Sequence, residues 1–256
     1  MMSYMKNAPV SLMLATHGQL RRRKPNLAVL PWGATEAHNQ HLPYGTDAMG
    51  AERVALRSAQ IAAGRGARVI VLPTIPFGNN AQQQDQIATV HFSTTTALAI
   101  LRDVANSLKR QGIERLIIVN GHGGNNFTPL VRDLVLETGI FIAVVNYWQT
   151  CMELQQKLFG DPGDHAGILE TSLMLHFCPD SVHMKAAGPG KRNPFAVAAL
   201  EQKGVWTPRP WTKIHPDLGA GDPHGATAES GKQAFEAFCE SLAKVLVDVS
   251  KAKHLP

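Results

Sequence analysis

Short runs of apolar residues alternate with longer amphipathic stretches along most of the chain. The apolar runs cover residues 26–31, 67–73, 115–120 and 139–148. Runs of this length that are apolar almost throughout are typical of strands buried on both faces. They therefore predict a parallel β-sheet.

Between and after these runs, apolar residues recur at helical spacing. The pattern predicts helices over residues 47–63, 93–111, 128–137, 168–177 and 227–251. Alternating buried strands and amphipathic helices indicate an α/β fold with a mostly parallel sheet and helices on both faces. Residues 184–225 are rich in Gly and Pro and show little periodicity. Because neither a linker nor an internal repeat divides the chain, residues 1–256 are predicted to form a single domain.

The composition narrows the class of protein. The chain has 256 residues, of which 44% are hydrophobic and 18% charged, so it can bury a large core. It contains no uninterrupted apolar stretch of the roughly 18 residues that a membrane span needs. The first twenty residues lack a secretory signal, and the three cysteines lack the spacing of a zinc site or a disulfide framework. These features predict a cytoplasmic protein without a membrane partner.

The net charge of +5 is not arranged as in nucleic-acid-binding proteins. The one dense basic run covers residues 21–24, and aromatic residues make up only 6% of the chain. Basic and aromatic residues do not interleave, as they do on many nucleic-acid-binding surfaces. The run is typical of a solvated surface, with contact to a polyanion as the alternative. We expect no nucleic-acid partner.

A polar cluster follows the first predicted strand and contains Glu36, His38 and Asp47. Gly33 and Pro43 keep the segment non-helical, and on an extended segment Glu36 and His38 lie on one face. Asp47 follows at the start of the next helix, where a carboxylate is favourable. Such a mixed set of nitrogen and oxygen ligands suits zinc, manganese or iron. The alternative is a polar surface loop with a helix-capping Asp47.

Two further polar clusters follow later in the chain. His122 lies among glycines directly after the third strand, in a segment without the lysine of a phosphate-binding loop. Asp164, His165 and Glu170 precede or open a helix, where Asp164 could orient the imidazole of His165. A tight turn and a helix-end carboxylate are the alternatives. Together with the first cluster, these residues supply the ligands that a two-metal centre needs.

The segments that carry these residues resemble the creatininase (creatinine amidohydrolase) family. They read LPWGATEAHNQHLPYGTD, VNGHGGNN and HAGILETSLML, and GAGDPHGATAESG at residues 219–231 is similar to the family's last motif. The resemblance covers roughly residues 25–250 and implies a single α/β domain. It also implies a metal-dependent hydrolase of C–N amide bonds that forms a homo-oligomer, a hexamer or a dimer.

The resemblance implies a role for each matching residue. Two divalent metal ions (Zn, Mn or Fe) are the expected cofactors, and Asp47 matches the bridging ligand. His165 matches the residue that passes a proton to the departing nitrogen. The other matching ligands are Glu36, His38, His122 and, as the candidate fifth, Glu170.

The sequence also departs from creatininase itself. Gly124 stands where creatininase has a metal-binding Glu, which shifts the completion of the second metal site to Glu170. Residues 160–164 lack the substrate-covering Trp, whereas Trp148 matches another Trp of the creatininase pocket or is a strand-end aromatic. The glutamine-rich residues 82–89 replace a family segment that ends in Pro-Gly-Thr. We interpret them as a distinct substrate loop or a plain surface loop.

The predicted reaction is hydrolysis of a small-molecule amide, other than a peptide bond, by a metal-activated water. Either Glu170 or the metal ions orient the nucleophile, and His165, polarised by Asp164, protonates the leaving nitrogen. The backbone N–H groups of Gly123 and Gly124 are candidates for stabilising the oxyanion. A two-metal phosphoester hydrolase is one alternative, although the three clusters contain no basic residue. A non-catalytic metal-binding member of the family is the other.

Overall fold

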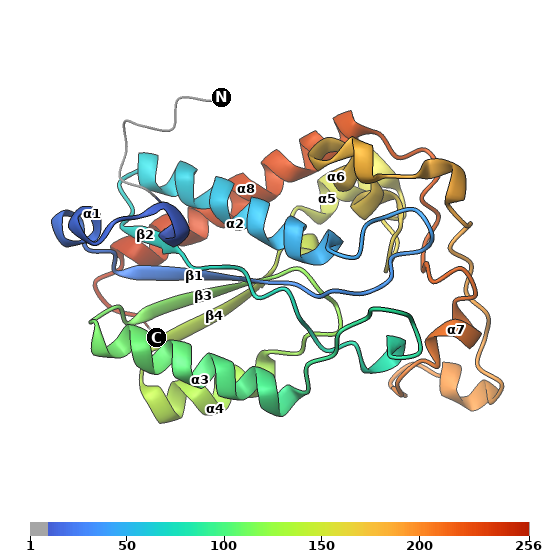
Figure 1. Cartoon of the computed structure of the whole chain (residues 1–256), viewed down its shortest axis with the longest axis horizontal. Coiled ribbons are helices and arrows are strands. Elements are labelled where there is room, and N and C mark those ends of the chain that lie inside the picture. Colours follow the sequence, from blue (N-terminus) through green and yellow to red (C-terminus); the bar gives the residue numbers. More distant parts are fainter. Residues whose placement is uncertain (1–9, 256) are drawn as a thin grey trace.

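A four-stranded sheet forms the middle layer of the molecule, in the order β2-β1-β3-β4 (Figure 1). All three strand pairings are parallel, which confirms the parallel sheet predicted from the apolar runs. The strands are β1 (Leu27–Trp32), β2 (Val69–Val71), β3 (Arg115–Asn120) and β4 (Phe141–Asn146).

This computed structural model describes residues 10–255. Residues 1–9, on which part of the expectation about a secretory signal rests, lie outside the described residues. The α-helices are α1 (His17–Arg22), α2 (Thr46–Gly64), α3 (Thr94–Arg110), α4 (Thr128–Thr138), α5 (Met152–Phe159), α6 (Ile168–Phe177), α7 (Trp211–Ile214) and α8 (Ala228–Lys251). Short 3-10 helices lie at Leu12–Leu14, Ala81–Gln83, Tyr147–Gln149, Pro179–Ser181, Met184–Ala186 and Ala198–Glu201.

Helices cover both faces of the sheet, as predicted. Helices α2, α5, α6 and α8 lie on one face, and α3 and α4 lie on the other (Figure 1). Every residue of β1 is buried, but its side chains alternate between two cores. Leu27 and Val29 pack toward α2 and α8, whereas Leu30 and Trp32 pack toward α3 and α4. The strand therefore connects the two apolar layers.

The strand order places a crevice at the carboxyl ends of β1 and β3. From β1 the chain crosses to β2 on one side, and it then returns to β3 on the other side. Such a switch point between neighbouring strands is where α/β sheets bind their ligands. The segments after β1 and β3 are the ones that carry the first two polar clusters.

The predicted helices correspond to α2, α3, α4, α6 and α8, with ends that differ by a residue or two. Helix α5 was not predicted, because Met152–Phe159 is short and half of its residues are polar. The fourth strand is shorter than its apolar run, since Tyr147–Gln149 forms a 3-10 helix after β4. The 3-10 helix after β4 brings Trp148 and Gln149 to the wall of the cavity described below.

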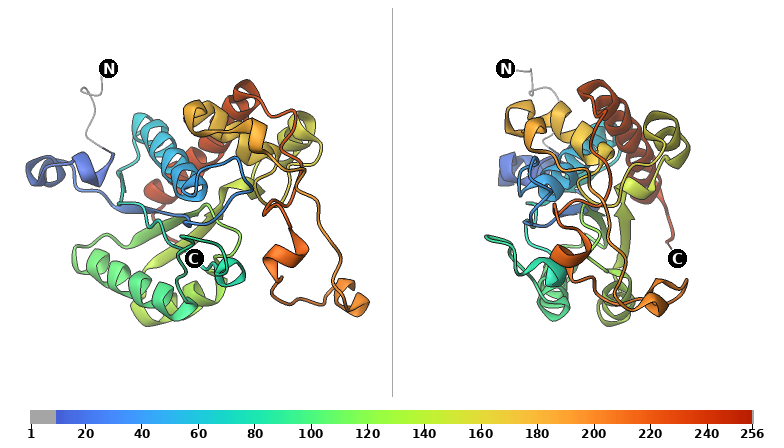
Figure 2. Two further views of the ribbon diagram at one scale, coloured as in Figure 1. Left: turned by 45° about the vertical axis from the view of Figure 1, so that its right-hand side comes forward. Right: turned by 90° about the vertical axis from the view of Figure 1, so that its right-hand side faces the viewer.

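The Gly- and Pro-rich part of the chain forms an irregular lobe. Figure 2 shows it in orange, projecting beside the carboxyl ends of the strands. It contains only short helical turns, among them Ala198–Glu201 and α7, which agrees with its lack of periodicity. Residues of this lobe form one wall of the cavity described below.

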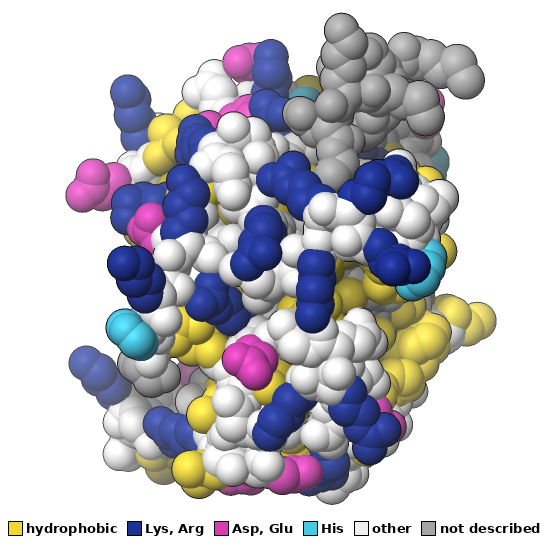
Figure 3. All heavy atoms as spheres, turned by 90° about the vertical axis from the view of Figure 1, so that its left-hand side faces the viewer, with side chains coloured by type: hydrophobic (Ala, Val, Ile, Leu, Met, Phe, Trp, Pro, Cys, Tyr) yellow, Lys and Arg dark blue, Asp and Glu magenta, His cyan; other side chains and the backbone are white. Residues whose placement is uncertain are grey.

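The opposite end of the molecule, at the amino ends of the strands, is rich in Lys and Arg (Figure 3). Two arginines at this end form hydrogen bonds to main-chain carbonyls of distant segments. Arg23 donates to the carbonyl of Ala67 at 3.0 Å, and Arg115 donates to the carbonyl of Ser250 at 2.7 Å. Over the described residues, no helix combines the length and the apolar character needed to span a membrane.

Candidate metal centre

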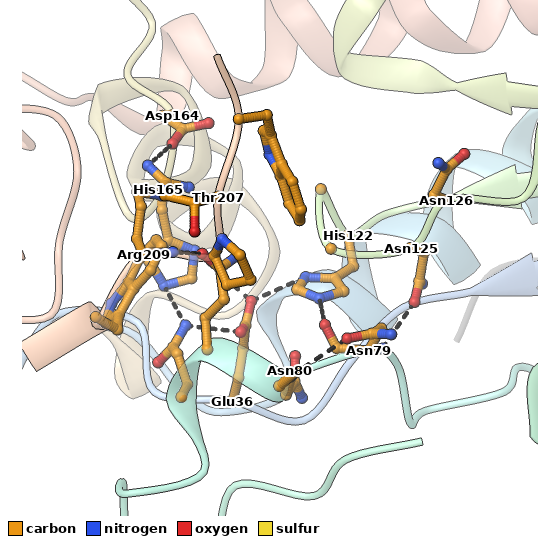
Figure 4. A pocket seen from close by; sticks show the side chains of 18 of the residues that line it. Glu36, Asn79, Asn80, His122, Asn125, Asn126, Asp164, His165, Thr207 and Arg209 are labelled. Atoms are coloured by element: carbon orange, nitrogen blue, oxygen red, sulfur yellow. Dashed lines mark hydrogen bonds and ion pairs between the residues drawn. The ribbon is translucent and has the colours of Figure 1, made fainter. Parts of the chain in front are cut away.

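A cavity of 930 Å³ opens at the carboxyl ends of β1 and β3 (Figure 4). Its lining includes residues from the loop after β1, the loop after β3 and the start of α6. The three polar clusters that are far apart in the sequence therefore meet at one place. The residues that meet there are Glu36, Asp47, His122, Asp164, His165 and Glu170.

The loop after β1 supplies three buried polar side chains. Glu36, His38 and Asp47 are at most 2% exposed. The Nε2 atom of His38 lies 2.9 Å from Oδ1 of Asp47. Its Nδ1 atom lies 3.0 Å from the main-chain oxygen of Glu36. Because a carbonyl oxygen only accepts hydrogen bonds, Nδ1 is the protonated donor and Nε2 faces the carboxylate.

The loop after β3 adds an imidazole between the two carboxylates. His122 Nδ1 lies 2.9 Å from Oε1 of Glu36 and 3.1 Å from Oδ2 of Asp47. On the other side of the ring, Nε2 donates to the carbonyl of Asn79 at 3.0 Å. His122 is thus oriented by a main-chain carbonyl in the same way as His38.

His165 shows the same orientation. Its Nε2 atom donates to the carbonyl of Ala37 at 2.8 Å, and its Nδ1 atom lies 3.7 Å from Oε1 of Glu36. Each of the three imidazoles therefore uses one ring nitrogen on a main-chain carbonyl and turns the other toward carboxylates. Metal-binding histidines in proteins are held in this way by partners outside the metal site.

Two carboxylate oxygens in the cluster lack conventional partners. Among the described residues, Glu36 Oε1 and Asp47 Oδ2 are buried without an aligned hydrogen bond, although His122 Nδ1 is close to both. Buried polar atoms are normally hydrogen-bonded, and buried charges are paired or coordinate metals. The donor set therefore fits a divalent cation.

The side chains form groups with metal-ligand spacing. One group is Glu36, Asp47 and His122, and a second is His38, Asp47 and Glu170. Asp47 belongs to both groups and presents a different oxygen to each imidazole, Oδ1 to His38 and Oδ2 to His122. A third possible group joins Glu36, His38 and His165. The geometry is compatible with two ions that share Asp47.

The buried charges shift the pKa values of the cluster. Burial opposes the charged form of His38, but the neighbouring carboxylate of Asp47 outweighs this and raises the pKa of His38 to about 10. Burial likewise opposes the ionised form of Asp47, and the nearby histidines still lower its pKa. The carboxylates thus stabilise a positive charge at the position where a metal ion would lie.

Glu170 enters the cavity from the first turn of α6. Its Oε2 atom accepts a hydrogen bond from the main-chain nitrogen of Ala166 at 2.5 Å. Burial raises the pKa of Glu170 to about 7, and the charge of Asp47 adds to this shift. A cation between Glu170 and Asp47 would favour the ionised form of both.

The expected contact between Asp164 and His165 is not formed. His165 lies on an extended segment that pairs with Ala220, and neighbouring side chains on such a segment point to opposite faces. The carboxylate of Asp164 instead accepts from Nη1 of Arg209 at 2.7 Å, and its side chain is 64% exposed. The orientation of the His165 ring comes from the carbonyl of Ala37, which no sequence motif indicated.

The remaining candidate residues lie around the cavity. Gly123, Gly124 and Trp148 all line it. A Cβ atom at Gly124 would lie 2.3 Å from the Asn79 carbonyl oxygen and 2.4 Å from Nε2 of His122. The backbone therefore leaves no room for the metal-binding side chain that creatininase has at this position. Trp148 also packs edge-to-face on Tyr147 at 5.8 Å, so it serves the core as well as the cavity.

The glutamine-rich loop contributes a residue that sequence reasoning did not single out. Gln83 is 3% exposed, and its amide nitrogen donates to Glu36 Oε2 at 2.7 Å. Its own carbonyl oxygen is buried without a partner among the described residues. The loop therefore fixes the second oxygen of Glu36. The signal was present in the sequence as the departure from the family pattern at residues 82–89.

The chain is similar in sequence to known proteins over most of its length. A sequence model described as creatininase, creatinine amidohydrolase, matches residues 13–246. The mycofactocin precursor peptide peptidase of Mycobacterium tuberculosis is 30% identical, over 94% of this chain and 93% of its own length. The creatinine amidohydrolase of Pseudomonas putida is 32% identical, over 85% of this chain and 87% of its own length.

Solved structures share the fold. A candidate creatinine amidohydrolase from Bacteroides fragilis is 38% identical, with a TM-score of 0.89 over 98% of this chain and 100% of its own. A mutant creatininase named as the Zn-Zn type superposes with a TM-score of 0.77 at 21% identity, over 95% of this chain and 99% of its own. The latter likeness concerns the fold alone.

Proposed function

This chain belongs to the creatininase family, and from that premise we propose that it is a metal-dependent amidohydrolase with two divalent cations. The proposed ligands are Glu36, His38, Asp47, His122 and Glu170. Zinc, manganese and iron all accept such a set of imidazoles and carboxylates. Asp47 belongs to two of the candidate ligand groups, which supports a centre of two ions.

The single observation that carries this proposal is the orientation of the imidazoles. His38 and His122 each donate one ring N–H to a main-chain carbonyl and turn the other nitrogen to Asp47, and Oδ2 of Asp47 has no aligned partner among the described residues. A cluster that served only to hold the fold would be expected to satisfy its buried oxygens.

The two ions would share Asp47. Glu36 and His122 complete the ligands of one position, and His38 and Glu170 complete those of the other. Gln83 and the main-chain N–H of Ala166 hold the outer oxygens of Glu36 and Glu170. Such supporting bonds fix the direction in which each carboxylate presents its remaining lone pairs.

Divalent ions in such a centre lower the pKa of water to near 7 and polarise a substrate carbonyl. The residues of the chain would then handle the protons. Burial lowers the pKa of His165, so its ring is neutral at pH 7. With Nε2 bonded to Ala37, Nδ1 is the basic atom, and it faces Glu36 and the cavity. We propose that Nδ1 takes a proton from the nucleophile and passes it to the leaving nitrogen.

The proposed substrates are amides, with small molecules and short peptides both included. Relatives named as a peptide peptidase and as a creatinine amidohydrolase support this wider range, which replaces the narrower expectation of non-peptide amides. Trp148 is proposed to contact the substrate, and the N–H groups of Gly123 and Gly124 to stabilise the oxyanion. All three residues line the cavity.

One observation bears on the phosphoester alternative. Arg192 and Arg209 from the irregular lobe line the cavity, although the motif segments contain no basic residue. Arg192 is paired with Glu201 at 2.8 Å, and Arg209 is paired with Asp164 at 2.7 Å. Each positive charge is therefore balanced by a carboxylate, which argues against a phosphate-binding role for the pair. The open cavity also argues against a non-catalytic role, for which an occluded site would be expected.

An amide and phosphoester screen with metal-loaded protein tests the proposal. The panel would hold creatinine, N-formyl amines, short peptides and p-nitrophenyl phosphate, each with chelated protein as the control. The expected result is hydrolysis of the C–N bond of at least one amide, lost on chelation and restored by zinc or manganese. Turnover of the phosphate ester without turnover of any amide would contradict the proposal.

A further inference from the structure

One guanidinium group stands on the cavity wall next to the proposed proton carrier. Arg209 precedes α7, and Figure 4 shows it beside His165, across the cavity from His122 and Asn125. It lines the cavity, and its side chain is 28% exposed. A molecule that fills the cavity would therefore meet a partly buried guanidinium on its wall.

Three side chains contact the guanidinium, those of Asp164, His215 and Trp211. Nη1 donates to Asp164 at 2.7 Å and lies 3.3 Å from Nε2 of His215. The group also stacks on the ring of Trp211 at 4.5 Å, a cation–π arrangement. His215 is 0% exposed, and its burial, with the charge of Arg209 adding to it, lowers the pKa of His215 to about 4. A neutral His215 can accept the hydrogen bond from Arg209.

The glutamine-rich loop fixes the backbone of the same segment. The main-chain nitrogen of Arg209 donates to Oε1 of Gln82 at 2.5 Å. Gln86 donates to the hydroxyl of Thr212 at 2.8 Å. The loop that positions Glu36 through Gln83 therefore also positions the segment that carries Arg209. The guanidinium is placed relative to the cluster by direct contacts.

Only part of the guanidinium takes part in hydrogen bonds with the described residues. Both polar contacts of its side chain are made by Nη1, and among residues 10–255 no acceptor is bonded to Nε or Nη2. An arginine presents its donors as a planar fork that matches a carboxylate. Arg192, the other arginine of the cavity, differs because its Nη2 atom already binds both carboxylate oxygens of Glu201.

We propose that Arg209 binds a carboxylate group of the substrate, so that the enzyme acts on amides of acidic molecules. This inference rests on the proposed function, because it places the amide at the metal cluster and the carboxylate on Arg209. A single open fork favours a carboxylate over a phosphate, since phosphate sites commonly gather several cationic or N–H donors. The exposed partner Asp164 competes with the substrate for the same charge.

The test compares charged and neutral members of a probe series on metal-loaded protein. The probes are the N-acetyl derivatives of glycine, β-alanine and γ-aminobutyrate, each paired with its uncharged primary amide, and binding is measured by calorimetry. In at least one pair the acid should bind about tenfold or more tightly than the neutral probe, as is typical of hydrogen bonds to charged groups. Arg209→Gln should abolish the preference, and Arg192→Gln, the matched change of charge, should retain it.

Two further variants distinguish binding of a substrate carboxylate by Arg209 from a purely structural role of this residue. Arg209→Lys keeps the charge but loses the fork, so it should retain only part of the preference. Asp164→Asn removes the competing carboxylate and should leave the preference intact or increase it. The proposal would be overturned if Arg209→Gln weakened the binding of charged and neutral probes equally. It would also be overturned if Asp164→Asn lost the preference for charged probes to the same extent as Arg209→Gln.

The binding measurement keeps this inference separate from the proposed function. If amides are hydrolysed without regard to charge and Arg209→Gln has no effect, the role of Arg209 is wrong and the amidohydrolase stands. If the Arg209-dependent preference is found but no amide is turned over, the amidohydrolase is wrong and the carboxylate site stands.

Discussion

The protonation of individual ring nitrogens decides what the cluster can bind. His38 donates from Nδ1 to the carbonyl of Glu36, and His122 donates from Nε2 to the carbonyl of Asn79. Each ring has one further nitrogen, which carries either a second proton or a lone pair for a metal. The pKa of His38, raised to about 10 by Asp47, means that a proton is held there at neutral pH when no cation competes.

Metal binding should therefore release protons. The folded pKa of His38 lies above its ordinary value of 6.5, so in the metal-free protein its contribution to stability is complete below pH 6.5 and lost as the pH rises toward 10. A divalent ion must displace this proton. Zinc titrations at pH 8 in two buffers of different ionisation enthalpy should show proton release, and metal affinity should increase with pH. Uptake of zinc without proton release would contradict this account.

Substitutions at two histidines should separate binding from proton transfer. His122→Ala removes a proposed ligand and should lose both bound metal and activity. His165→Ala should retain metal and reduce kcat by about 10²- to 10⁴-fold, the range of general acid–base catalysis. Metal analysis and steady-state kinetics check both, with the exposed His17→Ala as control. Because His165 can also join a metal-ligand group, loss of metal in His165→Ala would show that it is a ligand instead.

At the scale of elements, the site depends on how closely α2 approaches the sheet. Asp47 lies in the first turn of α2, which packs against the strand ends at Gly33 and Gly121. A Cβ atom at Gly33 would lie 2.3 Å from the main-chain nitrogen of Ala48, and one at Gly121 would lie 2.4 Å from the carbonyl of Asp47. The glycines let the helix start close enough for Asp47 to reach both imidazoles.

Gly33→Ala should move the start of α2 and weaken the metal site. The clash involves backbone atoms, so we expect a loss of about 1–3 kcal/mol in the free energy of unfolding, together with lower metal affinity. Gly64→Ala at the other end of α2 is the control, because its Cβ meets nothing within 4 Å. That change should be neutral or stabilising by up to about 1 kcal/mol. Denaturant unfolding measures both, and an equal effect of the two variants would contradict the packing argument.

The elements also show what the sequence could predict. Buried parallel strands are apolar throughout, so β1 and β3 were evident, and their carboxyl ends brought Glu36, Asp47 and His122 to the same edge of the sheet. Arg209 and His215 lie in a segment without periodicity, and their positions depend on distant contacts such as the bond from Arg209 to Gln82. No local pattern encodes such contacts. Asp164 was predicted to polarise His165 because the two residues are adjacent in sequence. On an extended segment, however, its side chain points away from His165.

At the scale of the whole molecule, the proposed ions would join segments that are distant in sequence. Their ligands come from the loop after β1, the start of α2, the loop after β3 and the start of α6. A ligand that binds only the folded chain stabilises it by mass action. Bound metal should therefore stabilise the packing of helices α2 and α6 around the end of the sheet, in addition to serving the reaction.

Removal of metal should lower the melting temperature reversibly. At a free metal concentration of 100 times Kd the linkage is worth about 2.7 kcal/mol. For a domain of this size each kcal/mol shifts Tm by about 2–4 °C. Thermal unfolding of chelated and reloaded protein, followed by circular dichroism, should differ by several degrees. Identical melting curves would mean that the cluster binds no metal in the folded state.

The central claim is that Asp47 joins two metal ions, and metal content per chain tests it most directly. Protein purified without chelators would be analysed by elemental mass spectrometry, beside Asp47→Asn prepared in the same way. We predict about two divalent ions per chain, as in two-metal hydrolases, and the loss of both in Asp47→Asn. A metal-free wild type, or about one ion that Asp47→Asn retains, would contradict the shared centre.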